Sequence, residues 1–140
     1  MDSQDKAALI VDRMFGDDAF SQWLGIEIME VSPGSCTLRM AIRPDMLNGF
    51  GIAHGGITYS LADSALAFAS NSRGRHALSV ETSISHTAPL HEGDTLTAAA
   101  AEEHLSNKIG VYRVELRDQS GKIVALFKGT VYRSSREWEI

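Results

Sequence analysis

The sequence predicts an α+β fold in which an antiparallel sheet of five or six strands wraps around one long central helix. First, residues 55–71 form a long apolar run with helical spacing. Second, two strand-like segments precede this run and four follow it. Because the helix is apolar on most of its sides, other elements must surround it, and a wrapped antiparallel sheet is an economical way to do so.

The first 24 residues are expected to form a helical lead segment. Residues 7–24 carry apolar side chains at approximately helical spacing, and Gly16-Asp17-Asp18 predicts a break before a second short helix. Two alternating segments follow at residues 25–31 and 36–42, and the turn residues 32–35 join them. These two segments therefore predict a β-hairpin.

The remaining elements are one helix and four strands. Residues 44–53 are expected to form a loop, and Gly74 suits the C-terminal cap of the long helix. In the first strand after the helix, alternate residues from Leu78 to His86 are expected to share one face. Further strands are predicted over residues 95–105, 109–117 and 122–133, and the turn at residues 119–121 closes the last hairpin.

Composition predicts one domain over residues 1–140, with the lead segment at residues 1–24 and the core at residues 25–133. The net charge of −5 argues against nucleic acid or an anionic membrane surface as the main partner. No apolar run approaches the roughly 20 residues that span a bilayer, and the polar N-terminus does not resemble a signal peptide. Because Cys36 is the only cysteine, no intramolecular disulfide is possible; we expect a packing role for Cys36 and a cytoplasmic protein.

A glycine pair at the start of the long helix is the most informative feature of the chain. Gly55 and Gly56 allow close approach to the backbone, and the first N–H groups of a helix form an electropositive tip. Eight residues after Gly55, Asp63 lies among apolar residues that would not select an acid for packing. A polarising tip and a poorly solvated carboxylate are two ingredients of acyl transfer.

This order of elements, with His54-Gly55-Gly56 at the start of the helix and Asp63 within it, resembles the hotdog fold. More narrowly, the chain resembles the phenylacetyl-CoA thioesterase (PaaI-like) family of hotdog acyl-CoA thioesterases. The matching segments are residues 46–49, 54–56, 60–65, 69–72, 93–98, 110–115 and 124–129. The resemblance covers residues 24–133 and departs in two places. Phe50 stands where family members often have a histidine, and the turn at residues 87–90 lacks the family's basic residue.

The resemblance implies roles for the residues at the start of the helix. The Gly55 N–H would bind the developing oxyanion, and the amide of Asn48 would orient the water or the carboxylate. Asp63 would act as general base on water, or attack the thioester to form a mixed anhydride. His54 and Ser64 are supporting candidates: His54 would hydrogen-bond the backbone and hold the loop, with proton transfer as a general base the alternative, and Ser64 would hydrogen-bond the carboxylate or the water. The pKa of Asp63 should be raised if desolvation dominates, and ordinary if Asn48 and Ser64 donate to it.

Coenzyme A is expected only as part of the substrate, and we expect no cofactor and no metal. Candidate contacts to substrate or coenzyme A are Gly56, Arg73, Asn107, Lys108 and Arg113. Arg113 could equally belong to a solvated face, and Arg73 could instead pair with Asp63. The other histidines show no metal-ligand spacing and are expected to be ordinary surface or strand residues: His76, His86, His91 and His104.

The spacing of Gly55 and Asp63 predicts a site shared between two subunits. Eight residues of helix separate the two by about 12 Å, whereas a base must lie within about 3 Å of its target or one water away. If both groups act on one thioester, the carboxylate must come from a neighbouring subunit with an antiparallel helix, which gives two identical sites in a two-fold homodimer. The resemblance extends this assembly to a homotetramer.

Hydrolysis of acyl-CoA thioesters is therefore the expected function. The resemblance suggests small aromatic acyl groups, such as phenylacetyl-CoA or hydroxylated phenylacetyl-CoA in phenylacetate degradation. A non-catalytic acyl-CoA-binding or regulatory hotdog protein is one alternative, and it would bind thioesters without turnover. A hotdog hydratase is the other, although its chemistry needs a histidine beside the acid, and no histidine of this chain is a convincing partner.

Overall fold

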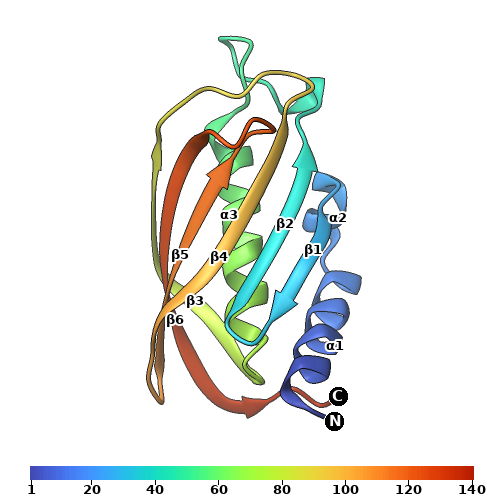
Figure 1. The fold of residues 1–140 in the computed structure, drawn as a ribbon, viewed down its shortest axis with the longest axis vertical. Coiled ribbons are helices and arrows are strands. Elements are labelled where there is room, and N and C mark those ends of the chain that lie inside the picture. Colours follow the sequence, from blue (N-terminus) through green and yellow to red (C-terminus); the bar gives the residue numbers. More distant parts are fainter.

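A computed structural model describes all residues from 1 to 140. The elements are α1 (Ser3–Gly16), α2 (Ala19–Leu24), β1 (Glu27–Ser32), β2 (Ser35–Ala41), a 3-10 turn η1 (Pro44–Met46), α3 (Gly55–Asn71), β3 (Arg75–His86), β4 (Thr95–Leu105), β5 (Ile109–Arg117) and β6 (Ile123–Glu137). The six strands form one antiparallel sheet in the order β1-β2-β4-β5-β6-β3. Figure 1 shows this sheet curving around α3, which confirms the predicted α+β fold.

The core lies between α3 and the inner face of the sheet. Alternate residues of the three middle strands are buried there: Leu96, Ala98, Ala100, Tyr112, Val114, Leu116, Ala125, Phe127 and Val131. Gly129 belongs to the same row, and a Cβ at this position would lie 2.5 Å from Cδ2 of Leu66. Helix and sheet therefore approach more closely here than any side chain on β6 would allow. Cys36 is buried in β2, and its burial raises the pKa of the thiol to about 12, in keeping with a packing role.

The lead segment forms two helices that pack beside β1 and α3 (Figure 1). The predicted break is confirmed, because Asp18 caps the N-terminus of α2 by accepting a hydrogen bond from the Ser21 N–H. Phe15 meets Phe68 of α3 edge-on, with ring centroids 6.3 Å apart. No helix of the structure is long and apolar enough to cross a membrane.

The end of α3 is tied down by polar side chains. Ser72, rather than the predicted Gly74, is the C-cap residue of α3; Gly74 follows with φ +112°, a conformation that favours glycine where the chain turns into β3. The buried amide of Asn71 accepts from the Ala77 N–H and the Trp138 indole, and donates to the carbonyls of Ala67 and Ala77. These bonds join α3 to β3 and to the residues after β6.

The prediction that alternate residues from Leu78 to His86 share one face is wrong. A β-bulge places the extra residue Val80 between Ser79, which pairs with Val131, and Glu81, which pairs with Thr130. Beyond the bulge, residues 82, 84 and 86 face α3, whereas Leu78 lies on the outer face. Leu78 and Val80 are 75% and 63% exposed, on a strand at the edge of the sheet.

Candidate active site at the start of the long helix

The first turn of α3 holds one backbone donor without a partner. His54 is the N-cap residue: its Nδ1 accepts from the Gly56 N–H at 2.9 Å, and its carbonyl accepts from the Ile57 N–H. The Gly55 N–H donates to no group of the chain. It therefore offers a free hydrogen bond at the positive end of a 17-residue helix.

A pocket of about 370 Å³ opens in front of Gly55. Its walls come from the loop before α3, from the first turn of α3 and from the end of β3 with the loop that follows. The lining residues are Asn48, Ile52, Ala53, Gly55, Thr58, His86, Thr87, Ala88, Pro89 and Leu90. The Asn48 side-chain oxygen accepts from the N–H groups of Phe50 and Ile52, which leaves its NH₂ group as a second free donor at the pocket.

Asp63 lies in the middle of α3, half-buried, and borders two other pockets. One contains Asp18, Ser21 and Ser64; the other lies between α3 and β3 and contains Ser79. No group of the chain donates a hydrogen bond to the carboxylate. Burial raises the pKa of Asp63, and the negative charge of Asp18 raises it further. Of the two pKa outcomes expected from the sequence, the structure has the one dominated by desolvation.

Ser64 does not hydrogen-bond to Asp63 as expected. Its hydroxyl is hydrogen-bonded to the Ser21 hydroxyl at 2.8 Å, and Ser21 in turn donates to Asp18. Ser64 thus joins α3 to α2 and holds Asp18 near Asp63. No local pattern indicates this contact, because 43 residues separate Ser21 from Ser64.

Gly55 and Asp63 border no common pocket within one chain. This arrangement agrees with the separation of about 12 Å that helical geometry predicts. One subunit therefore presents the free donor and the carboxylate in two different places.

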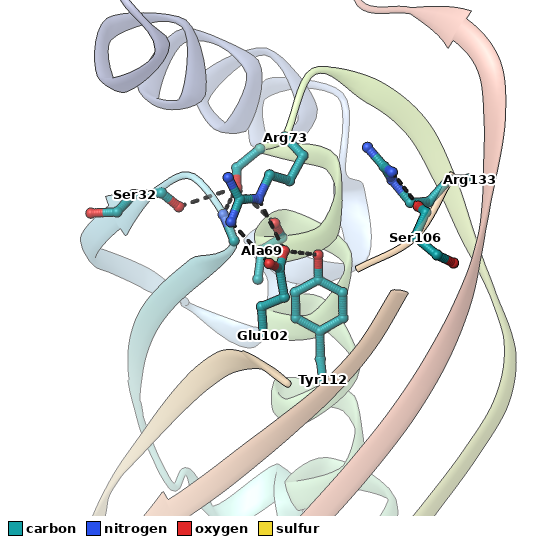
Figure 2. A network of polar contacts seen from close by, with 9 residues as sticks. Ser32, Ala69, Arg73, Glu102, Ser106, Tyr112 and Arg133 are labelled. Atoms are coloured by element: carbon teal, nitrogen blue, oxygen red, sulfur yellow. Dashed lines mark hydrogen bonds and ion pairs between the residues drawn. The ribbon is translucent and has the colours of Figure 1, made fainter. Parts of the chain in front are cut away.

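Arg73 does not pair with Asp63. The guanidinium group of Arg73 binds both carboxylate oxygens of Glu102, at 3.0 and 2.9 Å. The Tyr112 hydroxyl donates to the same carboxylate (Figure 2). The pKa of Arg73 is raised, chiefly by its hydrogen bond to Glu102. Arg73 therefore fastens the end of α3 to β4 and β5, about 25 Å along the helix from Gly55.

Asn107 and Lys108 lie in the turn between β4 and β5, at the same end of the molecule as Arg73. Two arginines bind this turn: Arg75 donates to Asn107, and Arg133 donates to the Ser106 carbonyl (Figure 2). Burial lowers the pKa of Arg133, and the nearby charge of Arg75 lowers it further. We call Arg75, Lys108 and Arg133 the basic end. These three cations lie together at this end of the molecule, and none of them forms an ion pair with a carboxylate.

Arg113 lies apart from this cluster. It pairs in register with Lys128 on the outer face of the sheet, and its Nε is 3.5 Å from Glu103. Because Gly55 lies on the inner side of the sheet, Arg113 and the free donor are on opposite faces. The candidate contacts predicted from the sequence thus occupy three separate regions: Gly56 at the start of α3, Arg73, Asn107 and Lys108 at its far end, and Arg113 on the outer face of the sheet.

His86, expected to be an ordinary surface or strand residue, is the last residue of β3 and lies at the candidate site. Its ring lies against Gly55: a Cβ built on Gly55 would be 3.2 Å from Nε2 of His86. His86 also lines the pocket in front of the free donor. Its expected place on the same face as Thr82 and Ile84 was the available signal, but alternation alone does not show which distant residue the end of a strand meets.

Comparisons with known proteins agree on one family. The model of the thioesterase superfamily matches residues 50–125. The acyl-coenzyme A thioesterase PaaI of Escherichia coli is 41% identical over 120 residues, which are 86% of each chain. The solved structure of the Escherichia coli PaaI protein, from the phenylacetic acid degradation operon, has a TM-score of 0.95 at 38% identity and covers 97% of this chain and 99% of that one. A variant of the phenylacetic acid degradation protein PaaI of Thermus thermophilus has a TM-score of 0.81 at 42% identity, covering 84% and 100%.

Proposed function

Since this chain belongs to the thioesterase superfamily and is an acyl-CoA thioesterase with the hotdog fold, we propose that its substrates carry small aromatic acyl groups. Phenylacetyl-CoA and its ring-hydroxylated forms are the proposed substrates, and phenylacetate degradation is the proposed setting. Two similar structures, from Escherichia coli and Thermus thermophilus, are of proteins assigned to phenylacetic acid degradation, which supports this choice.

The free N–H of Gly55 carries the proposed mechanism. A thioester carbonyl placed in the pocket would accept this hydrogen bond, and the helix dipole would add to the polarisation. As water attacks, the carbonyl oxygen becomes an oxyanion, and a donor already fixed at that point stabilises the charge without reorganisation. The free NH₂ group of Asn48 would orient the attacking group at the same pocket.

Asp63 would supply the base from a partner subunit. In the base mechanism its carboxylate takes a proton from water, whose oxygen bonds to the carbonyl carbon. Collapse of the tetrahedral intermediate then breaks the carbon–sulfur bond, and the coenzyme A thiolate leaves and takes up the proton. The reaction consumes one water, yields the free acid and coenzyme A, and requires no further cofactor. A half-buried carboxylate without hydrogen-bond donors is more basic than one in water, which suits this role.

An exposed apolar edge supports the proposed homodimer. Leu78 and Val80 project from the edge strand β3, and Phe50 is 90% exposed in the loop before α3. A long edge strand with apolar side chains is normally paired or covered. A two-fold contact along β3 would cover this edge and bring the two α3 helices near each other. A tetramer of two such dimers is the proposed complete assembly.

The basic end is the proposed contact for the coenzyme A phosphates. Arg73 lies ten residues beyond Asp63, or about 15 Å along the helix. If the partner's Asp63 faces Gly55, the partner's Arg73 lies about 15 Å beyond the start of α3. The nucleotide part of coenzyme A would extend into this region. Lys108 is the free cation there, whereas Arg73 and Asn107 are held by Glu102 and Arg75. Gly56, whose N–H is taken by His54, would contribute only close approach, and Arg113 would act only from the outer face.

Release of free thiol from a panel of thioesters tests the substrate class. We expect kcat/KM for phenylacetyl-CoA and 3-hydroxyphenylacetyl-CoA to exceed that for acetyl-CoA and butyryl-CoA by at least about tenfold, because a ring buries more apolar area than a short chain. Equal or better hydrolysis of the aliphatic thioesters would contradict the aromatic preference and leave the thioesterase activity standing.

The acid limb of the pH profile should respond to Asp18. Because the charge of Asp18 raises the pKa of Asp63, the Asp18→Asn variant should keep Asp63 ionised to lower pH, and the acidic fall in kcat should move to lower pH. Asparagine also caps a helix N-terminus, so α2 should remain intact. The matched control is Asp17→Asn, which removes a neighbouring exposed charge and should leave the limb in place. A limb that stays unchanged in Asp18→Asn would show that it does not report Asp63.

A further inference from the structure

His86 lies where it can act on the same atom as Gly55. Its ring approaches within 3.2 Å of the position that a Gly55 Cβ would occupy, and both residues line the pocket of about 370 Å³. No other ionisable side chain lines this pocket. Unlike His54 and His91, whose rings bind a backbone N–H and Asp94, the ring of His86 has no partner within the chain.

The fold fixes the direction of His86. It is the last residue of β3, and its pairing with the buried Ala125 turns its side chain towards α3. Ile84 and Thr82 precede it on the same face, opposite Phe127 and Gly129, and Thr82 is hydrogen-bonded to Tyr59 of α3. The strand that carries His86 is therefore held to the helix that carries Gly55.

The two donors are close enough to converge on one oxygen. The nitrogen of any residue lies about 2.5 Å from its own Cβ position, so the Gly55 nitrogen and Nε2 of His86 are at most about 5.7 Å apart. Two N–H groups that each bind at about 2.9 Å can share an acceptor when they are no more than about 5.8 Å apart. This condition holds for any orientation of the ring that keeps the observed contact.

We propose that the Nε2–H of His86 is a second hydrogen-bond donor to the thioester oxygen, so that Gly55 and His86 together form the oxyanion site. The inference rests on the proposed role of the Gly55 N–H. It requires the proton on Nε2, and Nδ1 is left free for water. No proton is transferred: the donor stabilises the negative charge that develops on the oxygen when the carbonyl is attacked. His86 is then a catalytic residue of the thioesterase reaction.

Two substitutions distinguish a role of His86 as a hydrogen-bond donor from a role as part of the pocket wall. His86→Phe keeps the volume of the ring and removes the donor, whereas His86→Gln keeps an N–H near the position of Nε2. We expect kcat for phenylacetyl-CoA to fall by about 10²-fold in His86→Phe, the usual effect of losing one oxyanion donor, and by less than about tenfold in His86→Gln. KM should change little in both variants, because the oxygen is only weakly charged before attack.

Binding of S-benzyl-CoA, a thioether without a carbonyl, is the second measurement. Its Kd should be the same for the wild type and both variants, since the proposed hydrogen bond needs the oxygen. His104→Gln, an exposed histidine on β4, is the matched control and should behave as the wild type.

Three results would overturn the proposal. They are kcat in His86→Phe within about threefold of the wild type, equal losses in His86→Phe and His86→Gln, or a change in the Kd of the thioether that matches the loss of kcat. Failure of the underlying mechanism would look different, because the Gly55 and Asp63 variants described below would then retain activity as well.

Discussion

Replacing Asp63 by asparagine is expected to reduce kcat by about 10³-fold and, at the same time, to make the protein more stable at neutral pH. The loss of rate follows from removal of the base or nucleophile, whose contribution is typically about 10²- to 10⁴-fold. The change is nearly isosteric, so the substrate should still bind. Thiol release and thermal unfolding of the same preparation measure the two effects.

The gain in stability follows from the direction of the pKa shift. Burial, and then Asp18, raises the pKa of Asp63 in the folded protein, so the folded state binds this proton more tightly than the unfolded state does. Ionised Asp63 therefore costs folding free energy at every pH above its folded pKa, and the cost disappears below the unfolded pKa of about 3.9. The melting temperature of Asp63→Asn should exceed that of the wild type at pH 7, and the difference should vanish on acidification to about pH 3.5.

Asp45→Asn is the matched control for both effects, because Asp45 is an exposed carboxylate on η1, outside all the pockets described above. It should change neither kcat nor the melting temperature appreciably. Full activity in Asp63→Asn would remove Asp63 from the mechanism. A lower melting temperature at pH 7 would show that the carboxylate has a stabilising partner in the assembled protein.

One isotope measurement then separates the two roles open to Asp63. In a single turnover in H₂¹⁸O with enzyme in excess, a general base delivers the heavy oxygen to the product acid. Heavy oxygen in the Asp63 carboxyl group instead establishes a nucleophile, because it arises only when water attacks the Asp63 carbonyl carbon of a mixed anhydride. Mass spectrometry of the acid and of the peptide that contains Asp63 distinguishes these outcomes.

Removing the Gly55 N–H is expected to be the second most damaging change. Gly55 is the first residue of α3, where proline is favoured, and His54 before it has φ −60° and ψ 135°, which a following proline accepts. Gly55→Pro should therefore fold and lack the donor. Gly55→Ala places a similar Cβ, 3.2 Å from Nε2 of His86, and keeps the N–H. We expect kcat in Gly55→Pro to be lower than in Gly55→Ala by about 10²- to 10³-fold.

Mixing the two inactive chains tests whether the site is shared. If Gly55 of one subunit works with Asp63 of the other, a mixed dimer of Gly55→Pro and Asp63→Asn has one intact site. Equal amounts refolded together give mixed dimers as about half of the population, so about one quarter of the wild-type activity should return. If each site were built within one chain, every site in the mixture would be damaged and no activity would return.

The local elements could be predicted from the sequence because their signals are local. Residues 55–71 form one helix as predicted, since their apolar spacing and the glycines at each end need no tertiary information. The hairpin of β1 and β2 follows from alternation and a turn in the same way. The start of α3 and its glycines were recognisable for the same reason.

Contacts between distant segments could not be predicted in this way. Alternation alone cannot show the bulge at Val80, because an extra residue changes the facing of a strand without changing its composition. The contact of His86 with Gly55 has no local signal either, because the two residues lie on different elements of the fold. Ser64 bonds to Ser21 of α2, and Arg73 bonds to Glu102 of β4, and both partners are chosen by the way helices and sheet pack.

The bulge divides β3 into two parts that contact different surroundings. Before it, Leu78 presents an apolar side chain to the outside; beyond it, Ile84 and His86 face the helix. Because the extra residue absorbs the change of facing, substitutions in the first part need not disturb the second. In the proposed dimer, however, the partner subunit is held along the first part of β3 and supplies its carboxylate to the pocket at the end of the second part. A substitution that changes association along β3 would therefore also change the chemistry, so that one strand couples assembly to catalysis.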